Sequence, residues 1–503
     1  MSSLDDIREN RLSKLKKLQD SGINPFPVKS KQDLENAEVI KNFSKFLRGK
    51  KKEISLVGRI MSLRPQGAII FFNFSDGTGV FQALLKKAPA TFVKQNLKGQ
   101  GTLSIDDFKL FEDTADIGDF VEIRGKLFLT KRKEKTIEVH HWRMLSKGLR
   151  PLPEKWHGLQ DVEERFRKRY LDTLMNDEVK EKFLLRTRMI NEIKNFYNSQ
   201  GFVEVEVPML QPLAGGANAR PFITHHNALD MDFYLPTAQE LYLKELLVGG
   251  FTKVYEIGRR FRNEGIDHTH NPEFTMLESN IAYGDAQKDR KFIEDLFKYV
   301  VKKLFNKTKV EYDGQLIDFG KKFAVIKFLD TLKRYALISE PESISRNDAA
   351  LKAKQLGVKV EEHESLEKIL DNIFKKVARP KLTQPTFIVD HPVAMNPFAK
   401  RKEDNSNLID RFQLIVGGIE LVNAFSETNN PIEQRQRYLE EDKRGKAGEG
   451  DISPSDEAYI EAMEYGMPPN SGIGIGIDRL AMLLTDTKNI KEVILFPTLR
   501  PKD

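Results

Sequence analysis

Two stretches near the middle of the chain alternate in polarity as β-strands do. The first runs from Lys253 to Arg262 and the second from Glu273 to Glu278, and a polar loop rich in Gly, Asp, His, Asn and Pro joins them. This pattern predicts a β-hairpin. The hairpin would present Arg262 as a fork-shaped clamp for anions, Phe274 as a flat apolar ring and Glu264 as a hydrogen-bond acceptor. Together these groups suit a nucleotide, although a hairpin of solvated surface charges would show the same alternation.

The chain before this hairpin contains a helix and then several short strands. Apolar residues at helical spacing predict an amphipathic helix that ends before Gly22. Five strand-like runs follow, at Ile54–Met61, Ala68–Ser75, Val80–Leu85, Asp119–Leu129 and Thr136–Met144. Five short strands with glycine turns predict a small barrel of the OB type. Its phenylalanines at Phe71, Phe72 and Phe74 would either stack on unpaired bases or fill the barrel core.

Longer helices are predicted in the second half of the chain. One runs from Val179 to Gln200 and leads into a strand at Phe202–Val207. Between Tyr283 and Arg411 the pattern is mostly that of amphipathic helices with many lysines, with strand character at Thr386–Val389. We interpret this region as an insertion that carries no chemical motif.

Two further strands carry candidate chemistry. In the segment Gly417–Glu427, alternation places Asn423, Phe425 and Glu427 on one face. An acid beside an aromatic ring can receive an alkyl ammonium, because the methylenes pack on the ring while the charge meets the carboxylate.

The second of these strands is rich in glycine. Between Gly472 and Ile477, alternation puts three glycines on one side and three isoleucines on the other, which gives a flat floor for a planar ring. A helix that starts near Asp478 would then direct Arg479 toward phosphates.

Composition narrows the classes of protein that fit. The chain has 503 residues, of which 40% are hydrophobic and 31% charged, as in globular proteins. It contains no cysteine, which excludes disulfides, thiolate metal sites and a catalytic thiol. No apolar run approaches the roughly 20 residues of a membrane span, so we expect a cytoplasmic protein with no membrane association. The net charge of +7 mildly favours a polyanionic partner.

Several segments resemble one enzyme family, the class II aminoacyl-tRNA synthetases in the form carried by lysyl-tRNA synthetases. The helix, strand and proline of 179–208 resemble the first signature motif of the class. The second motif resembles FRNEGIDHTHNPEFTMLE at 261–278, and the third resembles GIGIGIDRLAMLLT at 472–485 followed by ILFPTLRP. The segment GRIMSLRPQGAIIFFNFSDGTGVFQ at 58–82 resembles the anticodon-binding barrel of the lysyl-, aspartyl- and asparaginyl-tRNA synthetases.

This resemblance implies an α+β homodimer with two functional domains. An N-terminal OB-fold β-barrel would be followed by a class II catalytic domain, an antiparallel sheet flanked by helices. The expected boundaries are a helical segment at 1–52, the barrel at 53–147, a linker at 148–178 and the catalytic domain at 179–503, with a helical insertion at about 284–380.

The resemblance also implies the substrates and the residues that bind them. The partners would be ATP, L-lysine and tRNA(Lys), with Arg262 and Arg479 as catalytic residues. ATP would be bound by Arg262, Glu264, His270, Asn271, Phe274, Gly474, Gly476 and Arg479. Lysine would be bound by Gly216, Glu240, Arg262, Glu278, Asn423, Phe425 and Glu427. The anticodon would be bound by Phe71, Gln82 and Glu134.

One candidate metal ligand matches the family pattern, and two other positions depart from it. Glu420 matches a carboxylate that binds Mg²⁺, but simple alternation turns it away from Asn423 unless a β-bulge intervenes. Where the family commonly has a second metal-binding acid, this chain has Gln413, and a neutral amide is a weaker ligand for a hard cation. The family's tyrosine at the ammonium end of the lysine pocket is replaced by Asn280.

Three rival functions share some of these features. An aspartyl-type synthetase would need a cation where this chain has Glu427. A paralogue that lysylates a protein usually lacks the barrel. A non-catalytic OB protein would have no reason to keep Arg262, Glu264 and Arg479 together.

Overall fold

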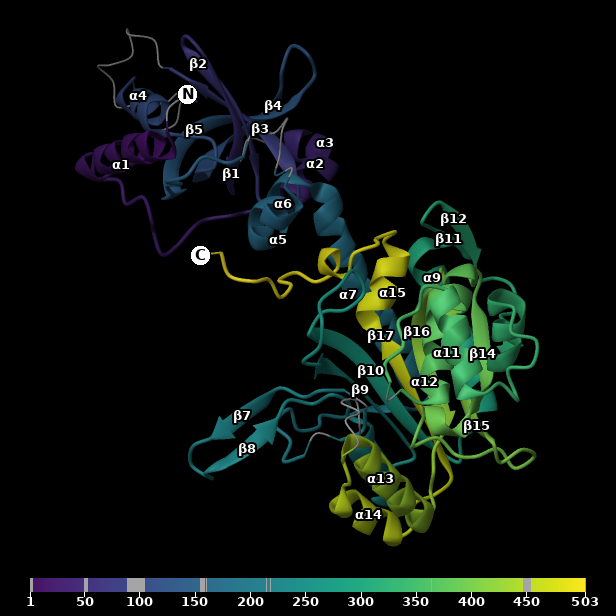
Figure 1. The fold of residues 1–503 in the computed structure, drawn as a ribbon. Helices are drawn as coiled ribbons and strands as arrows, with labels where there is room; N and C mark the ends of the chain where they lie inside the picture. The colour runs from purple at the N-terminus through teal and green to yellow at the C-terminus, as the bar shows by residue number, and fades with distance from the viewer. Residues whose placement is uncertain are drawn as a thin grey trace. The chain divides into compact units, whose positions relative to one another are not determined.

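The computed structural model describes residues 3–48, 53–87, 105–153, 159, 161–213, 215–217, 219–362, 364–446 and 454–502. The chain divides into two compact units, Met1–Gly158 and Leu159–Asp503 (Figure 1). Within the described ranges, no helix has the length and apolar character needed to cross a membrane.

The first unit is a closed five-stranded barrel with helices. Its elements are α1 (Leu4–Asp20), α2 (Asn36–Lys41), α3 (Phe43–Arg48), β1 (Ile54–Gln66), β2 (Ile69–Ser75), β3 (Val80–Lys86), α4 (Ile105–Thr114), β4 (Phe120–Leu129) and β5 (Lys135–Ser146). The strands close in the order β1-β2-β3-β5-β4. The predicted barrel is therefore present, and the chain between β3 and β4 contains the helix α4.

Alternation along β2 separates core residues from outward ones. Phe72 and Phe74 are at most 1% exposed and pack in the barrel core. Phe71 lies between exposed and buried and points to the other face of the strand. The barrel-core interpretation thus applies to Phe72 and Phe74 but not to Phe71.

The second unit is built on an eight-stranded sheet. Its strands are β6 (Val203–Glu204), β9 (Lys253–Phe261), β10 (Glu273–Ala282), β13 (Ala324–Lys327), β14 (Thr386–Pro392), β15 (Leu408–Val416), β16 (Ile419–Ser426) and β17 (Asn470–Gly476). The order is β13-β14-β15-β16-β17-β10-β9-β6. The outer pairs β13–β14 and β6–β9 are parallel, and the remaining pairs are antiparallel. The predicted hairpin is β9–β10.

The described part of the second unit also contains helices and two small hairpins. The helices are α5 (Val162–Arg167), α6 (Arg169–Met175), α7 (Asp177–Ser199), α8 (Glu240–Val248), α9 (Ala286–Phe305), α10 (Phe328–Thr331), α11 (Arg346–Gln355), α12 (Leu366–Ile373), α13 (Pro431–Lys446), α14 (Glu457–Glu464) and α15 (Ile477–Leu484). The small hairpins are β7 (Ile223–His226) with β8 (Met231–Tyr234), and β11 (Lys309–Tyr312) with β12 (Gln315–Asp318).

The main core lies on one face of the sheet. There α7, α9 and α15 pack on side chains such as Leu277 of β10 and Ile473 and Ile475 of β17. Figure 1 shows α9 and α15 beside β16 and β17. The alternate residues, Met276 and Glu278 among them, point to the other face, where two cavities lie.

The stretch predicted as a helical insertion is mostly helical but also contains strands. β13 joins the main sheet, because residues 324–327 pair with 386–389. The helices α9 to α12 do not form one body. α9 belongs to the main core, whereas α10 to α12 pack around a separate cluster that includes Phe328, Ile369 and Phe374.

Candidate active site

Two adjoining cavities occupy the open face of the sheet. The first, which we call the arginine cavity, has a volume of about 190 Å³. It is lined by every residue predicted to bind ATP, namely Arg262, Glu264, His270, Asn271, Phe274, Gly474, Gly476 and Arg479. The second, the acidic cavity, has a volume of about 220 Å³. It is lined by every residue predicted to bind lysine, namely Gly216, Glu240, Arg262, Glu278, Asn423, Phe425 and Glu427. Arg262 and Asn423 line both.

Arg262 keeps hydrogen-bonding capacity for a ligand. Its guanidinium carbon lies 5.2 Å from the centroid of the Phe274 ring, and its buried Nε has no hydrogen-bond partner within the described part of the chain. Burial lowers the pKa of Arg262, with Glu264 opposing, yet an arginine stays charged. A buried donor without a partner is costly, so an anion bound here would gain a strong, charge-assisted contact.

Arg260, two residues earlier on the same face, is used differently. Its Nε donates to Glu278 Oε1 at 3.1 Å, and it also forms an ion pair with Glu256. Glu278 Oε2 additionally accepts a hydrogen bond from the backbone N–H of Gln239 at 2.7 Å. Arg260 is therefore committed to the protein, and it holds the Glu278 carboxylate at the edge of the acidic cavity.

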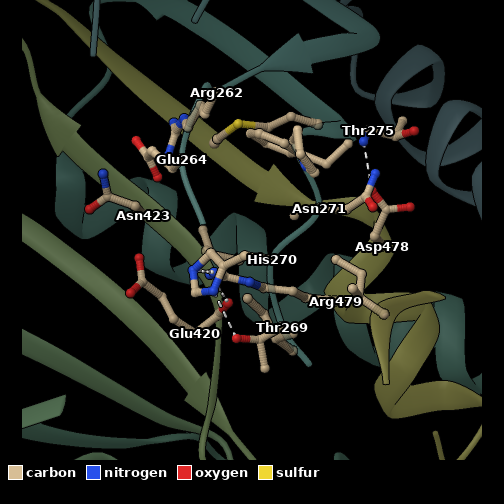
Figure 2. A pocket seen from close by; sticks show the side chains of 18 of the residues that line it. Arg262, Glu264, Thr269, His270, Asn271, Thr275, Glu420, Asn423, Asp478 and Arg479 are labelled. Carbon is tan, nitrogen blue, oxygen red and sulfur yellow. Dashed lines mark hydrogen bonds between the residues drawn. The ribbon is translucent and has the colours of Figure 1, made fainter. Parts of the chain in front are cut away.

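Arg479 and His270 lie side by side in the arginine cavity (Figure 2). His270 Nδ1 is 2.8 Å from Asp267 Oδ2, and a carboxylate can only accept, so this nitrogen carries the proton. His270 Nε2 is then the acceptor for Arg479 Nη2 at 3.1 Å. Burial of Asp267 is outweighed by its hydrogen bonds from Thr269 and His270, which lower the pKa of Asp267 to about 2. These contacts join the hairpin loop to α15.

Two glycines of β17 lie so close to neighbouring side chains that a larger residue would not fit. A Cβ at Gly474 would lie 2.5 Å from the Met276 Cε, and one at Gly472 would clash with Glu427 Oε1. Gly216 is glycine for a different reason, since its φ of +84° is a left-handed conformation.

Asn423 is oriented by a neighbouring strand. Arg411 Nε donates to Asn423 Oδ1 at 2.8 Å, so the amide oxygen is occupied. The NH₂ group remains to donate at the junction of the two cavities, where it suits a carboxylate or phosphate oxygen.

Several carboxylates converge in the acidic cavity, and a lysine of the protein itself balances part of their negative charge. Lys244 Nζ donates to Glu427 Oε2 at 2.9 Å and to Glu240 Oε1 at 3.3 Å. Asn280 Nδ2 donates to Glu427 Oε1 at 3.3 Å. Burial raises the pKa of Glu240 to about 8, while Lys244 opposes this shift. Burial also raises the pKa of Glu427, and Lys244 is the strongest opposing influence.

A β-bulge accounts for Glu420. Leu414 pairs with Val422 and Ile415 with Glu420, which leaves Leu421 as an extra residue on β16. Glu420 and Asn423 therefore both reach the arginine cavity, and Figure 2 shows them on one side of it. Gln413 does not line either cavity, and its Oε1 accepts from His391 Nε2 at 3.2 Å.

The barrel brings together Gln82 and Glu134, two of its three predicted contact residues. Gln82 Nε2 donates to Glu134 Oε2 at 3.1 Å, while Gln82 Oε1 accepts from the Thr136 hydroxyl at 2.7 Å. The amide of Gln82 is thus held in one orientation. Phe71 pairs with Leu84 on the same two strands, β2 and β3, that pair Asn73 with Gln82.

The sequence analysis did not identify Lys244 as part of the site, and it did not distinguish the role of Arg260 from that of Arg262. The spacing of Glu240 and Lys244, four residues apart on one helix, was a usable signal for their ion pair. The pairing of Lys244 with Glu427 had no local signal, because 183 residues separate them.

Comparisons with known proteins agree with this architecture. The family model for class II tRNA synthetases (D, K and N) matches residues 161–500, and the model for the OB-fold nucleic acid binding domain matches residues 54–145. A lysine–tRNA ligase of Carboxydothermus hydrogenoformans is 44% identical over 505 residues, covering 99% of each chain. The lysine–tRNA ligase of Aquifex aeolicus is 45% identical over 452 residues, covering 90% of this chain and 74% of its own. That of a Roseiflexus species is 41% identical over 502 residues, covering 99% of this chain and all of its own.

Proposed function

The chain belongs to the class II tRNA synthetases of the D, K and N group, among the lysine–tRNA ligases, and we propose that its two adjoining cavities hold ATP and lysine. It activates L-lysine with ATP to lysyl-adenylate and transfers the lysyl group to the 3′ end of tRNA(Lys). The observation that carries the proposal is the sharing of Arg262 and Asn423 by both cavities. The bond that forms in activation joins the two substrates at such a junction.

In the proposed arrangement, ATP occupies the arginine cavity. Its adenine stacks on Phe274 above the floor made by Gly474 and Gly476. Arg262 and Arg479 contact the phosphates, and Glu264, His270 and Asn271 complete the site.

Lysine occupies the acidic cavity in an orientation set by its charges. Glu240 and the backbone of Gly216 hold the α-ammonium, while Arg262 and Asn423 hold the α-carboxylate. The side chain packs on Phe425, and its ε-ammonium meets Glu427, with Glu278 nearby. An aspartate side chain has no suitable cation here, because Lys244 is buried and paired with Glu427 and Glu240.

Activation then needs positioning and charge stabilisation. The lysine carboxylate attacks the α-phosphorus in line, the bond to the bridging oxygen breaks and pyrophosphate leaves. No protein nucleophile takes part. Arg262 holds both reacting groups, and Arg479 stabilises negative charge on the phosphates.

The residues present fit a Mg²⁺ ion bound together with ATP. Mg²⁺ usually keeps several waters and takes one or two protein carboxylates beside substrate phosphates. Glu420 and Glu264 both line the arginine cavity and supply such carboxylates. Gln413 would be at most a weak ligand, since its amide oxygen is engaged by His391. The ion would neutralise charge on the phosphates.

A pyrophosphate-exchange assay across the amino acids tests the proposed function. We expect exchange that requires lysine, because only a cationic side chain complements Glu427. We also expect it to require Mg²⁺, which would neutralise charge on the phosphates of ATP. Faster exchange with aspartate or asparagine than with lysine would contradict the assignment of the acidic cavity.

We further propose that the barrel binds the anticodon through Phe71, Gln82 and Glu134. Phe71→Ala should raise the KM for tRNA in aminoacylation, because stacking on a base is worth about 1–3 kcal/mol. Lysine-dependent exchange without tRNA should stay unchanged. The matched control is Phe72→Ala on the same strand, which opens a cavity in the core and should lower the melting temperature instead. Equal damage to both reactions in Phe71→Ala would show that this residue is structural.

The assembly and location are further parts of the proposal. The segment from α7 to Leu210 is proposed as the interface of a homodimer, and the exposed apolar residues Leu184, Val203, Met209 and Leu210 support this. Analytical ultracentrifugation would report the dimer.

We keep the barrel at 53–147, the linker at 148–178 and the catalytic domain from 179 as proposed boundaries. We propose the cytoplasm as the location, where translation takes place.

A further inference from the structure

Lys244 is a fully buried cation outside the two cavities. Its side chain is 1% exposed, and it does not line the acidic cavity although both of its carboxylate partners do. Its Nζ lies 4.9 Å from the centroid of the Phe398 ring and 5.4 Å from that of Tyr459. Burial lowers the pKa of Lys244, but Glu240 and Glu427 outweigh it and raise this pKa well above its ordinary value. Lys244 is therefore charged at neutral pH.

Each oxygen of the Glu427 carboxylate accepts one hydrogen bond from the protein. Oε2 binds Lys244 from behind the cavity wall, and Oε1 accepts from Asn280. Each carboxylate oxygen has two lone pairs, so each can still accept a second hydrogen bond from a ligand in the cavity. A carboxylate held by two donors cannot rotate freely, and its remaining lone pairs keep a fixed direction.

Without Lys244 the two glutamates would face each other with no cation of the protein between them. Buried like charges favour protonation of one partner. A protonated Glu427 loses most of its attraction for an ammonium.

We propose that Lys244 is a positioning residue for substrate lysine, which fixes the Glu427 carboxylate from behind the acidic cavity and keeps it ionised. This inference rests on the proposed role of Glu427 as the receptor of the ε-ammonium. Lys244 touches no substrate atom and acts through Glu427.

Other titratable groups also face Glu427 and must be held constant in a test. They are Glu240 of α8, Glu278 of β10, Asp289 of α9, Asp410 of β15 and Tyr459 of α14. Burial raises the pKa of Asp289 to about 7, and Asp285, Asp410 and Glu427 add to this rise. The ratio of variant to wild-type KM removes the titration of the free substrate.

The experiment is the pH profile of the lysine KM in pyrophosphate exchange from pH 6.5 to 8.5. Lys244→Gln should raise the lysine KM at least tenfold at pH 6.5, with the ATP KM within twofold of wild type. The ratio of variant to wild-type lysine KM should fall as the pH rises, because Glu427 regains its charge. Lys291→Gln, the same change at an exposed lysine of α9, should give a ratio near one throughout.

Lys244→Arg tests whether the position of the cation matters in addition to its charge. It also keeps the proposal testable if Lys244→Gln does not fold. It keeps the cation but moves it, so the lysine KM should rise several-fold with a ratio that does not depend on pH. A lysine KM within twofold of wild type in Lys244→Arg would overturn the positioning role. A constant ratio in Lys244→Gln, or an equal rise in the lysine and ATP KM values, would also overturn it and leave a structural ion pair.

Glu427→Gln distinguishes the inference from its premise. If it leaves the lysine KM unchanged, the proposed role of Glu427 fails, and the inference fails with it. If Glu427→Gln raises the lysine KM and Lys244→Gln does not, only the inference about Lys244 is wrong.

Discussion

Replacing Arg262 by glutamine is expected to lower the rate of lysine-dependent pyrophosphate exchange about 100- to 1000-fold. Loss of one preorganised donor to a developing anion costs about 2.7–4 kcal/mol in other enzymes, and Arg262 lines both cavities with no partner for its buried Nε among the described residues. Glutamine keeps a polar amide but not the charge or the fork. Because Arg262 serves both substrates, the KM values for ATP and for lysine should both rise.

Two neighbouring arginines make the test specific. Arg259 points to the opposite face of β9, where it pairs with Glu273 at 3.5 Å and is 45% exposed, so Arg259→Gln should change the exchange rate less than twofold. Arg260→Gln should lower the melting temperature, because it leaves Glu256 and Glu278 without their shared cation. A loss of less than tenfold in Arg262→Gln, with the fold intact by circular dichroism, would remove Arg262 from the proposed catalytic role.

Glu427→Gln is expected to lower the kcat/KM for lysine at least 100-fold. The substrate ammonium would be buried without its counter-charge, and breaking such a pair costs about 3–5 kcal/mol. The KM for ATP should change little, since Glu427 lines only the acidic cavity of the two.

Stability must be measured alongside, because Glu427 also binds Lys244. Lys244 keeps Glu240 as a partner, so the variant should fold with a somewhat lower melting temperature. The matched control is Glu457→Gln on α14, an exposed glutamate paired with Arg435, which should leave the lysine kcat/KM unchanged. An effect below tenfold in Glu427→Gln would mean that the ε-ammonium is bound elsewhere.

Local pattern was enough for the strands that carry the site. The alternation of β10 correctly put Phe274, Met276 and Glu278 on one side, and that of β17 correctly separated its glycines from its isoleucines. In a strand, successive side chains must point to opposite faces, so one burial preference fixes the whole set. The family resemblance then assigned roles to these positions, and the structure gathers them in two cavities.

The pairing of charges was decided by the tertiary structure. Arg260 and Arg262 share a face and a residue type, yet only Arg260 meets carboxylates that saturate it. The position of Glu420 depended on the extra residue Leu421, which only the pairing of β15 with β16 reveals. Lys244 and Glu427 meet across the fold from α8 and the end of β16. Alternation acts between adjacent residues and is written in the sequence, whereas the energy of a buried charge depends on which distant groups share its low-dielectric surroundings, and only the folded chain brings those groups together.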